Sequence, residues 1–120
     1  MISIVTGNEL VSPPIWVDFT ATDWDGRLRL DFPGTVRSLA RWHISLGDGL
    51  RLLVFDWDSL VAGVPDDLVA VGICRYDDGE RRWVLDEWEP AVHVSDLDAV
   101  QRNLYWAASD DRPSAPPDPP

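Results

Sequence analysis

The sequence predicts a mainly β protein of the α+β class, built on a small, strongly bent antiparallel sheet or an SH3-like barrel. Three observations lead to this prediction. Short apolar runs recur along the chain and are separated by turn residues. The run from residue 27 to 32 alternates strictly between charged and apolar side chains, as in a half-buried strand. Helical spacing of apolar residues occurs at two places, near residues 35–42 and near residues 96–108.

Five to seven short strands account for the apolar runs. Two adjacent prolines, Pro13 and Pro14, separate the first two runs, and Gly47-Asp48-Gly49 turns the chain into the fourth. The segment Asp77-Asp78-Gly79-Glu80 predicts a hairpin turn, and Pro90 interrupts the chain before the last run. The expected strands cover residues 2–5, 15–20, 27–32, 52–56, 68–76, 81–86 and 92–94.

The two expected helices are short and peripheral. The first spans about residues 35–42 and lies between the third and fourth strands. The second carries Leu97, Val100 and Leu104 at helical spacing, and residues 95–98 before it read as a capping box. Each helix is expected to pack an apolar stripe against the sheet.

The length and composition indicate one domain. We expect residues 1–108 to form a single globular domain and residues 109–120, which are polar and rich in proline, to be a disordered tail. A single cysteine excludes an internal disulfide framework. No apolar run approaches the ~18 residues of a membrane span, and the N-terminus has no basic, apolar leader. These features predict a cytoplasmic protein without a membrane partner.

The charge balance is unusual. The chain has 10 basic and 21 acidic residues, a net charge of −11, and every basic residue is an arginine. Such a field repels phosphate backbones and anionic membrane surfaces, so nucleic acid is not an expected partner. A basic protein is the partner that the field favours. The same composition is also typical of a salt-adapted domain whose acidity maintains solubility and has no specific basic partner.

The strand end Asp56-Trp57-Asp58 raises the possibility of a phosphatase. An apolar strand followed by Asp-x-Asp resembles the first motif of the haloacid-dehalogenase phosphatases. Those enzymes also need a lysine, which this chain lacks, and a Gly-Thr pair where Ser59 stands alone. The match is therefore ascribed to chance. A carboxylate pair could still hold Mg²⁺ with help from a phosphate, which leaves open a small metal- or ligand-dependent enzyme using Asp56 and Asp58.

Other catalytic and metal-binding patterns are missing from the sequence. His43, Cys74 and His93 are the only histidine and cysteine residues, and their spacing matches no zinc motif. The glycines stand singly at turns and form no phosphate-binding cluster. The sequence therefore predicts no catalytic residues, no metal and no cofactor.

Seven tryptophans are the strongest sign of a binding surface. Trp83, which alternates with Leu85, is expected in the core, and Trp106, beside the apolar stripe of the last helix, is expected to pack that helix down. Trp57 lies between two aspartates and Trp88 between two glutamates, and an indole ringed by carboxylates suits an Arg or Lys of a partner. The structural alternative is that these rings cover the ends of the barrel. The candidate partner-binding residues are Trp57, Trp88, Asp56, Asp58, Glu87 and Glu89.

Two long segments, residues 28–58 ("LRLDFPGTVRSLARWHISLGDGLRLLVFDWD") and 72–96 ("GICRYDDGERRWVLDEWEPAVHVSD"), resemble a family of small uncharacterised bacterial proteins. The shared features are a Gly-Thr helix start, an "I-x-L-x-x-G" turn, an acidic strand end, a hairpin and a Trp. The resemblance covers roughly residues 16–96. It supports the fold and implies no activity.

Taken together, these patterns predict a non-enzymatic, acidic protein-interaction module. An inhibitor or immunity-type protein that masks a basic surface is one form that such a module takes. The enzyme and the salt-adapted domain are the alternatives.

Overall fold

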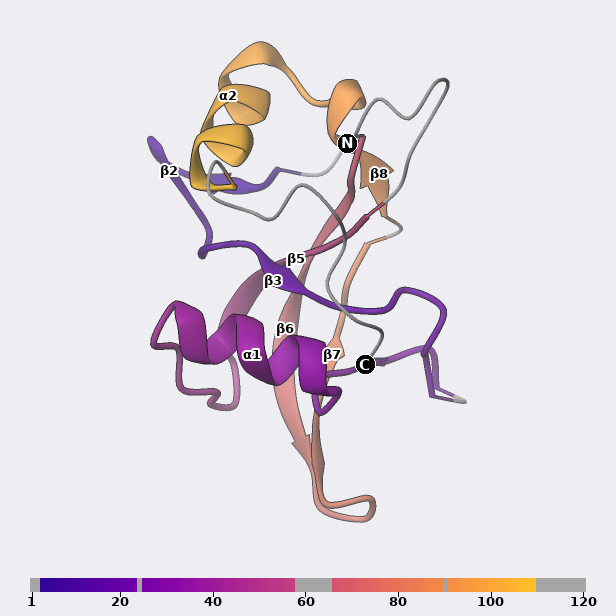
Figure 1. The fold of residues 1–120 in the computed structure, drawn as a ribbon. Coiled ribbons are helices and arrows are strands. Elements are labelled where there is room, and N and C mark those ends of the chain that lie inside the picture. The colour runs from indigo at the N-terminus through magenta and orange to yellow at the C-terminus, as the bar shows by residue number, and fades with distance from the viewer. Residues whose placement is uncertain (1–2, 24, 58–65, 90, 110–120) are drawn as a thin grey trace.

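A computed structural model describes residues 3–23, 25–57, 66–89 and 91–109 (Figure 1). In chain order the elements are β1 (Val5–Thr6), β2 (Glu9–Leu10), β3 (Ile15–Trp16), β4 (Leu28–Arg29), α1 (Pro33–Arg41), β5 (Arg51–Asp56), β6 (Leu68–Asp77), β7 (Arg82–Asp86), β8 (Val92–His93), the 3-10 helix η2 (Val94–Asp96) and α2 (Ala99–Ala108). The predicted tail lies almost wholly outside the described residues.

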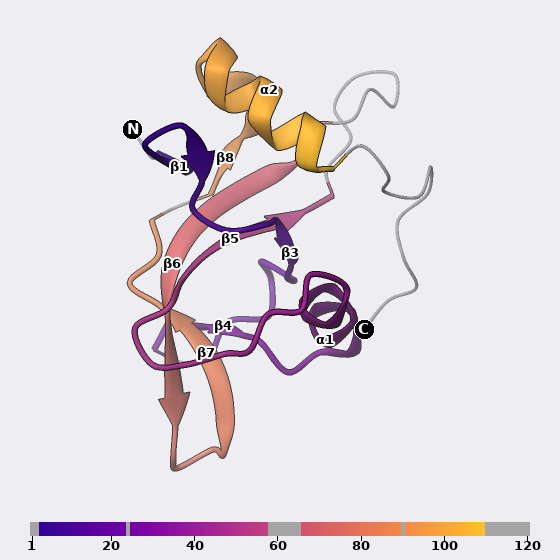
Figure 2. The ribbon, with the colours of Figure 1, turned by 90° about the vertical axis from the view of Figure 1, so that its left-hand side faces the viewer.

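A strongly curled six-stranded sheet forms the centre of the fold. The strand order is β3-β5-β6-β7-β4, and β8 pairs with β6 beyond the end of β7. The long strand β6 curves through the whole sheet, and β5 follows it along its upper half (Figure 2). The expected α+β class, the strongly bent sheet and the two helices are thereby confirmed. Among the described residues the sheet forms a half-barrel and not a closed barrel.

The sheet is mixed, whereas the sequence predicted a wholly antiparallel one. The edge strand β3 runs parallel to β5, with Ile15 opposite Val54 and Trp16 opposite Phe55. A parallel pair needs a long crossover connection. Here β4 and α1 lie between the two strands in the chain and supply that connection.

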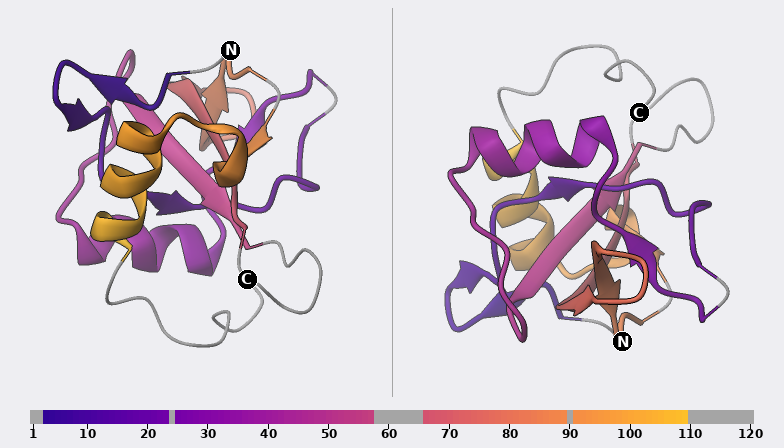
Figure 3. Two further views of the ribbon diagram at one scale, coloured as in Figure 1. Left: turned by 90° about the horizontal axis from the view of Figure 1, so that it is seen from above. Right: turned by 90° about the horizontal axis from the view of Figure 1, so that it is seen from below.

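Two apolar clusters lie on opposite faces of the sheet, because side chains alternate along β5. Leu52 and Val54 belong to the cluster that includes Leu39 of α1. Leu53 and Phe55 belong to the cluster that includes Tyr105 of α2. The two helices therefore cover different faces of the sheet (Figure 3).

The buried face of α2 differs from the predicted stripe. Leu97 is buried just before the helix, but Val100 is 66% exposed, and the residues that α2 buries are Gln101 and Tyr105. The carboxylate of Asp98 caps the helix by accepting a 2.9 Å hydrogen bond from the Gln101 amide. The helix thus begins at Ala99, with Asp98 and not Ser95 as its N-cap, so Leu97 lies before the helix and is not part of a stripe along it.

Polar contacts explain why Gln101 is buried. Its side-chain Oε1 accepts a 2.8 Å hydrogen bond from the amide of Ile4, at the other end of the chain. Its Nε2 donates to Asp98 at 2.8 Å. A buried amide side chain is stable when its donors and acceptors are paired in this way.

No helix in the described ranges is long and apolar enough to cross a membrane.

Candidate functional site

Strands β7 and β8 both pair with the same edge of β6, and the ladder of backbone hydrogen bonds along this edge is interrupted between them. On one side, β6 pairs with β5 from Leu68 to Ile73. On the other side, Ile73 lies opposite Asp86 of β7, and Val69 lies opposite Val92 of β8. Between these two pairs stand three residues on β6 and five, residues 87–91, on the facing chain. The facing chain therefore carries two extra residues between the paired positions, and we call residues 87–91 the bulge.

Glu87 begins the bulge in an unusual backbone conformation. Its φ is +50°, in the left-handed region of backbone conformation that residues other than glycine rarely adopt. Its amide donates a 2.8 Å hydrogen bond to the carboxylate of the preceding residue, Asp86. Its own carboxylate accepts a 3.0 Å hydrogen bond from Arg75 on β6. These contacts hold the chain as it turns away from the strand.

Gly72 allows the bulge to cross β6 closely. A Cβ at this position would lie 2.7 Å from Cγ of Leu85, 2.8 Å from Cβ of Trp88 and 2.9 Å from the carbonyl oxygen of Asp86. Real side chains do not tolerate such distances, so only glycine fits without a shift of the facing chain. A glycine inside a strand often marks a bulge or a close backbone approach of this kind.

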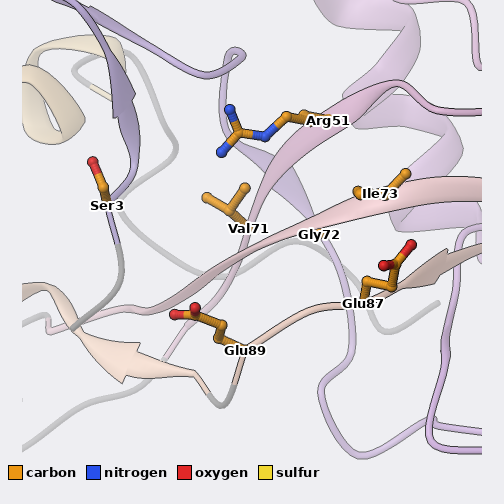
Figure 4. Close-up of a pocket in the computed structure, with 7 residues that line it drawn as sticks. All are labelled: Ser3, Arg51, Val71, Gly72, Ile73, Glu87 and Glu89. Atoms are coloured by element: carbon orange, nitrogen blue, oxygen red, sulfur yellow. The ribbon is translucent and has the colours of Figure 1, made fainter.

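A hollow of about 410 Å³ lies over the interruption (Figure 4). Its floor is the backbone of β6 with the side chains of Val71 and Ile73, on the sheet face that α2 covers further along. Ser3 and Arg51 line one rim, and the bulge lines the other. The lining among the described residues is Ser3, Arg51, Val71, Gly72, Ile73, Glu87 and Glu89.

The rim of the hollow carries charges of both signs. Glu87 is paired with Arg75 at 3.0 Å, in an exposed pair that contributes little stability. Among the described residues, no ion-pair partner lies within bonding distance of Glu89 or of Arg51. The hollow therefore offers one carboxylate and one guanidinium that are available to a ligand.

The predicted segment Glu87-Trp88-Glu89 contributes to the hollow, although its ring does not line it. The ring of Trp88 lies on the other side of the chain, where it packs against Phe19 with 5.7 Å between ring centroids. Its Nε1 donates a 2.9 Å hydrogen bond to the carbonyl oxygen of Gly26. This half-buried ring thus joins the bulge to the loop before β4. Its contact with a partner stays a prediction.

The other predicted tryptophan, Trp57, packs among aromatic rings at the end of β5. Its ring lies edge-on to Phe55 at 5.3 Å and tilted against Trp16 at 6.1 Å. It packs on the α2 side of the sheet, whereas Trp88 packs on the α1 side. The structure does not bring the two rings together, and the predicted residue Asp58 lies outside the described residues.

The predicted carboxyl of Asp56, at the end of β5, has an unusual pKa. Burial raises its pKa to about 6, and the negative charge of nearby Asp18 adds to this effect. The amide of Phe19 donates a 3.4 Å hydrogen bond to its Oδ2 and partly opposes the rise in pKa. A carboxyl with such a pKa is a candidate proton donor or acceptor near neutral pH.

The described residues contain no group of three or more His, Cys, Asp or Glu side chains that could hold a metal ion. Cys74 is buried in β6, and burial raises the pKa of its thiol to about 11. A thiol with this pKa is almost wholly protonated near neutral pH and is a poor nucleophile.

A second hollow of about 380 Å³ is mainly apolar. Its described lining is Asn8, Glu9, Leu10, Ser12, Pro13, Trp42, Leu104 and Ala108. Glu9 is the only charged residue in that lining, so this surface offers less to a charged partner than the hollow over β6.

Sequence reasoning missed the floor and the cationic rim of the hollow over β6. Arg51, Val71 and Ile73 looked like ordinary strand residues. Two signals could have indicated the site. Gly72 stands inside an apolar strand, and Pro90 interrupts the facing chain, and both are typical of a bulge.

The geometry defines the chain as a small α+β domain with a bulged, curled sheet and a charged hollow. Comparisons of the chain with family models, with curated proteins and with solved structures found no match. The resemblance to a family of small bacterial proteins therefore stays a prediction.

Proposed function

We propose that the protein is a non-enzymatic interaction module that binds a basic protein, with the hollow over β6 at the centre of the contact. The observation that carries this proposal is the combination of an apolar floor with the carboxylates of Glu87 and Glu89 at the rim. The net charge of −11 steers a basic partner toward the surface. The apolar floor then supplies surface that becomes desolvated on binding, which is typical of energetic hot spots. An inhibitor that masks a basic surface fits this description.

The groups that line the hollow favour binding over chemistry. Ser3 is the only hydroxyl in the described lining, and it donates to the carbonyl oxygen of Val5 at 3.3 Å, not to a base. The remaining side chains are aliphatic or are an arginine and two glutamates. A nucleophile and a base within hydrogen-bond reach of each other, which covalent catalysis requires, are not found among these residues.

The proposal is tested by affinity capture with paired variants. The tagged protein, its Glu87→Gln/Glu89→Gln variant and an Asp78→Asn/Asp96→Asn control are used on the same cell extract at about 0.15 M salt. The control removes the same charge from exposed positions outside the hollow. We expect a basic protein that the wild type and the control retain and the hollow variant loses. Equal loss with both variants would instead support the salt-adapted alternative, because binding would then follow net charge alone.

The predicted tryptophan contacts are tested in the same assay. Trp57→Ala removes a half-buried ring that lies outside the described lining of the hollow. If Trp57 is a hot spot, its truncation should speed dissociation and cost about 2 kcal/mol of binding free energy. If the partner dissociates from Trp57→Ala as slowly as from the wild type, Trp57 is not part of the contact and the hollow alone carries it.

One observation favours the enzyme as a second candidate. Asp56 is half-buried with a pKa of about 6, next to residues 58–65, which are outside the described residues. Titration calorimetry with Mg²⁺, Mn²⁺ and Zn²⁺ distinguishes the candidates. We expect no stoichiometric micromolar site, and a site that disappears in Asp56→Asn would support the enzyme instead.

A further inference from the structure

The interruption of the β-ladder leaves the backbone N–H and C=O of one β6 residue, Val71, without a hydrogen-bond partner among the described residues of the facing chain. The amide of Cys74 donates to the carbonyl oxygen of Leu50 at 2.8 Å, and its carbonyl oxygen accepts from Gly49 at 2.9 Å. The backbone groups of Cys74 therefore point toward the β5 side. Because these directions alternate along a strand, those of Gly72 point to the β5 side and those of Val71 point away from it.

The residues two positions before and after Val71 have partners on that far side. Ile73 pairs with Asp86 of β7, and Val69 pairs with Val92 of β8. Opposite Val71 stands the bulge, and no hydrogen bond from its described residues reaches the Val71 amide or carbonyl. Both groups therefore point toward the bulge without a partner among its described residues, and Val71 is one of the residues that line the hollow.

A backbone N–H and C=O that lack partners inside a sheet can form hydrogen bonds with an extended segment of another molecule. Backbone amides and carbonyls are satisfied in nearly all folded proteins, by protein, water or ligand. Extended peptides bind sheets by supplying the missing backbone partner, while neighbouring pockets select side chains. The hollow that Val71 lines has a volume of about 410 Å³, which lies within the usual range for ligand pockets and suits a short guest of this kind.

We propose that the hollow receives one Arg or Lys residue within an extended segment of the basic partner. The backbone of this guest residue pairs with the amide and carbonyl of Val71, and its side chain lies against Glu89. The inference rests on the proposed function and adds the manner of binding to it.

Register and charge both select such a guest. A residue paired directly with Val71 directs its side chain to the same sheet face as Val71, which is the face with the hollow. Glu89 on this rim is available to a cation, whereas Glu87 is held by Arg75. Arg51 on the opposite rim repels a second cation, so a segment with a single basic residue is favoured over a polybasic run.

The test uses four synthetic peptides of seven residues and the full chain labelled with ¹⁵N. The parent peptide has one central arginine flanked by valine and threonine. The second peptide carries a central arginine that is methylated on its backbone nitrogen, which removes one backbone hydrogen-bond donor and keeps the charge of the side chain. The third carries citrulline, which keeps the backbone and removes the charge. The fourth has arginine at the central three positions.

For the parent peptide, we expect a downfield shift of the Val71 amide proton and slower exchange of this proton with solvent. N-methylation should weaken binding about fivefold, the usual net effect of one lost hydrogen bond. Citrulline in the peptide, or Glu89→Gln in the protein, should weaken binding about tenfold, as expected for a charged hydrogen bond. The polybasic peptide should bind no more tightly than the parent, and Asp78→Asn should leave every affinity unchanged.

The outcomes separate the inference from the proposed function. Binding that leaves the Val71 amide unshifted, or that tolerates N-methylation, overturns the backbone pairing. Absence of binding by every peptide overturns it as well. In either case, a captured protein that still depends on Glu87 and Glu89 would uphold the proposed function. If the peptides pair with Val71 as expected and no basic protein depends on these glutamates, the inference holds and the proposed function fails.

Discussion

The hydroxyl of Tyr105 donates a 2.6 Å hydrogen bond to Oδ2 of Asp67, and both residues are fully buried. The bond joins α2 to the chain immediately before β6. Buried carboxylates are costly unless hydrogen bonds satisfy them. This contact therefore helps to fix the position of α2 on the sheet.

Replacing Tyr105 by phenylalanine should destabilise the protein by about 1–3 kcal/mol, because Asp67 loses a donor in a buried site. The matched control is Tyr76→Phe, which changes a residue that is 40% exposed. The control should alter the free energy of unfolding by less than about 0.5 kcal/mol. Urea unfolding of the three proteins at pH 7 provides the measurement, and equal effects of the two changes would contradict the role given to the buried bond.

Adding a methyl group at Gly72 should destabilise the fold by about 1–3 kcal/mol, because the new Cβ meets Leu85, Trp88 and the Asp86 backbone. At Gly47, the comparison position, a Cβ would meet nothing within 4 Å. Gly47→Ala should be neutral or stabilise by up to about 1 kcal/mol, since it reduces the entropy of the unfolded chain. Thermal unfolding of both variants checks this pair. A neutral Gly72→Ala would show that the bulge is not tightly packed on β6.

Asp56 should make stability depend on pH in the sense opposite to that of most carboxyls. Its folded pKa of about 6 exceeds the unfolded value near 3.8, so the folded chain binds the proton more tightly. Its contribution to stability is therefore full below about pH 4 and is lost as the pH rises through about 6. Asp56→Asn should be more stable than the wild type at pH 7 by about 1 kcal/mol, after allowance for solvent screening of a half-buried group. Near pH 4 the difference should disappear.

The pKa of Asp56 can be measured directly from the pH dependence of its carboxyl ¹³C chemical shift. Asp18→Asn removes a negative charge near Asp56 and should lower the pKa of Asp56, although burial remains the larger cause. In contrast, hydrogen bonds and nearby arginines hold the pKa of Asp23, Asp31 and Asp77 below the usual value. An Asp56 resonance that titrates with these three would refute the assignment.

Removal of residues 110–120 should leave the thermal midpoint nearly unchanged, because a polar, proline-rich segment has little apolar surface to bury. A longer truncation, before Ser95, should abolish cooperative unfolding, since it removes Leu97, Gln101 and Tyr105 from the core. Calorimetry of the two truncated chains checks both expectations. A fall of many degrees in the shorter deletion would mean that the predicted domain boundary is wrong.

Local signals in the sequence were sufficient to predict most elements of the fold. Strict alternation found the strand around Leu28, and the turn residues 77–80 placed the hairpin between β6 and β7. The parallel pairing of β3 with β5 was not predicted. Parallel pairing depends on how the whole crossover packs, and no short segment records it.

Polar burial explains the errors at α2. Apolar spacing selected Val100, which is exposed, and passed over Gln101 and Tyr105, which are buried. Their burial depends on bonding partners at Ile4 and Asp67, and those contacts exist only in the folded chain. A periodicity analysis cannot detect them.

Part of the candidate site was accessible to sequence reasoning. The sequence singled out Glu87, Trp88 and Glu89, but it predicted that the ring and the carboxylates would contact a partner together, whereas the ring packs against Phe19 and only the two glutamates line the hollow. The hollow itself follows from a difference of two residues between β6 and the facing chain. That difference becomes visible only when the pairs at both ends of the bulge are known.

The hydrogen bond from the amide of Ile4 to Gln101 joins residues 97 positions apart, so it forms only after nearly the whole folded part of the chain has been synthesised. A ribosome adds roughly 5–20 residues each second, so Leu53 and Phe55 are made several seconds before Tyr105, which packs over them. During that interval the α2 side of the sheet has no helical cover. Once β5 has left the ribosome, its apolar side chains can therefore be bound by a chaperone or contacted by a neighbouring nascent chain until α2 packs over them.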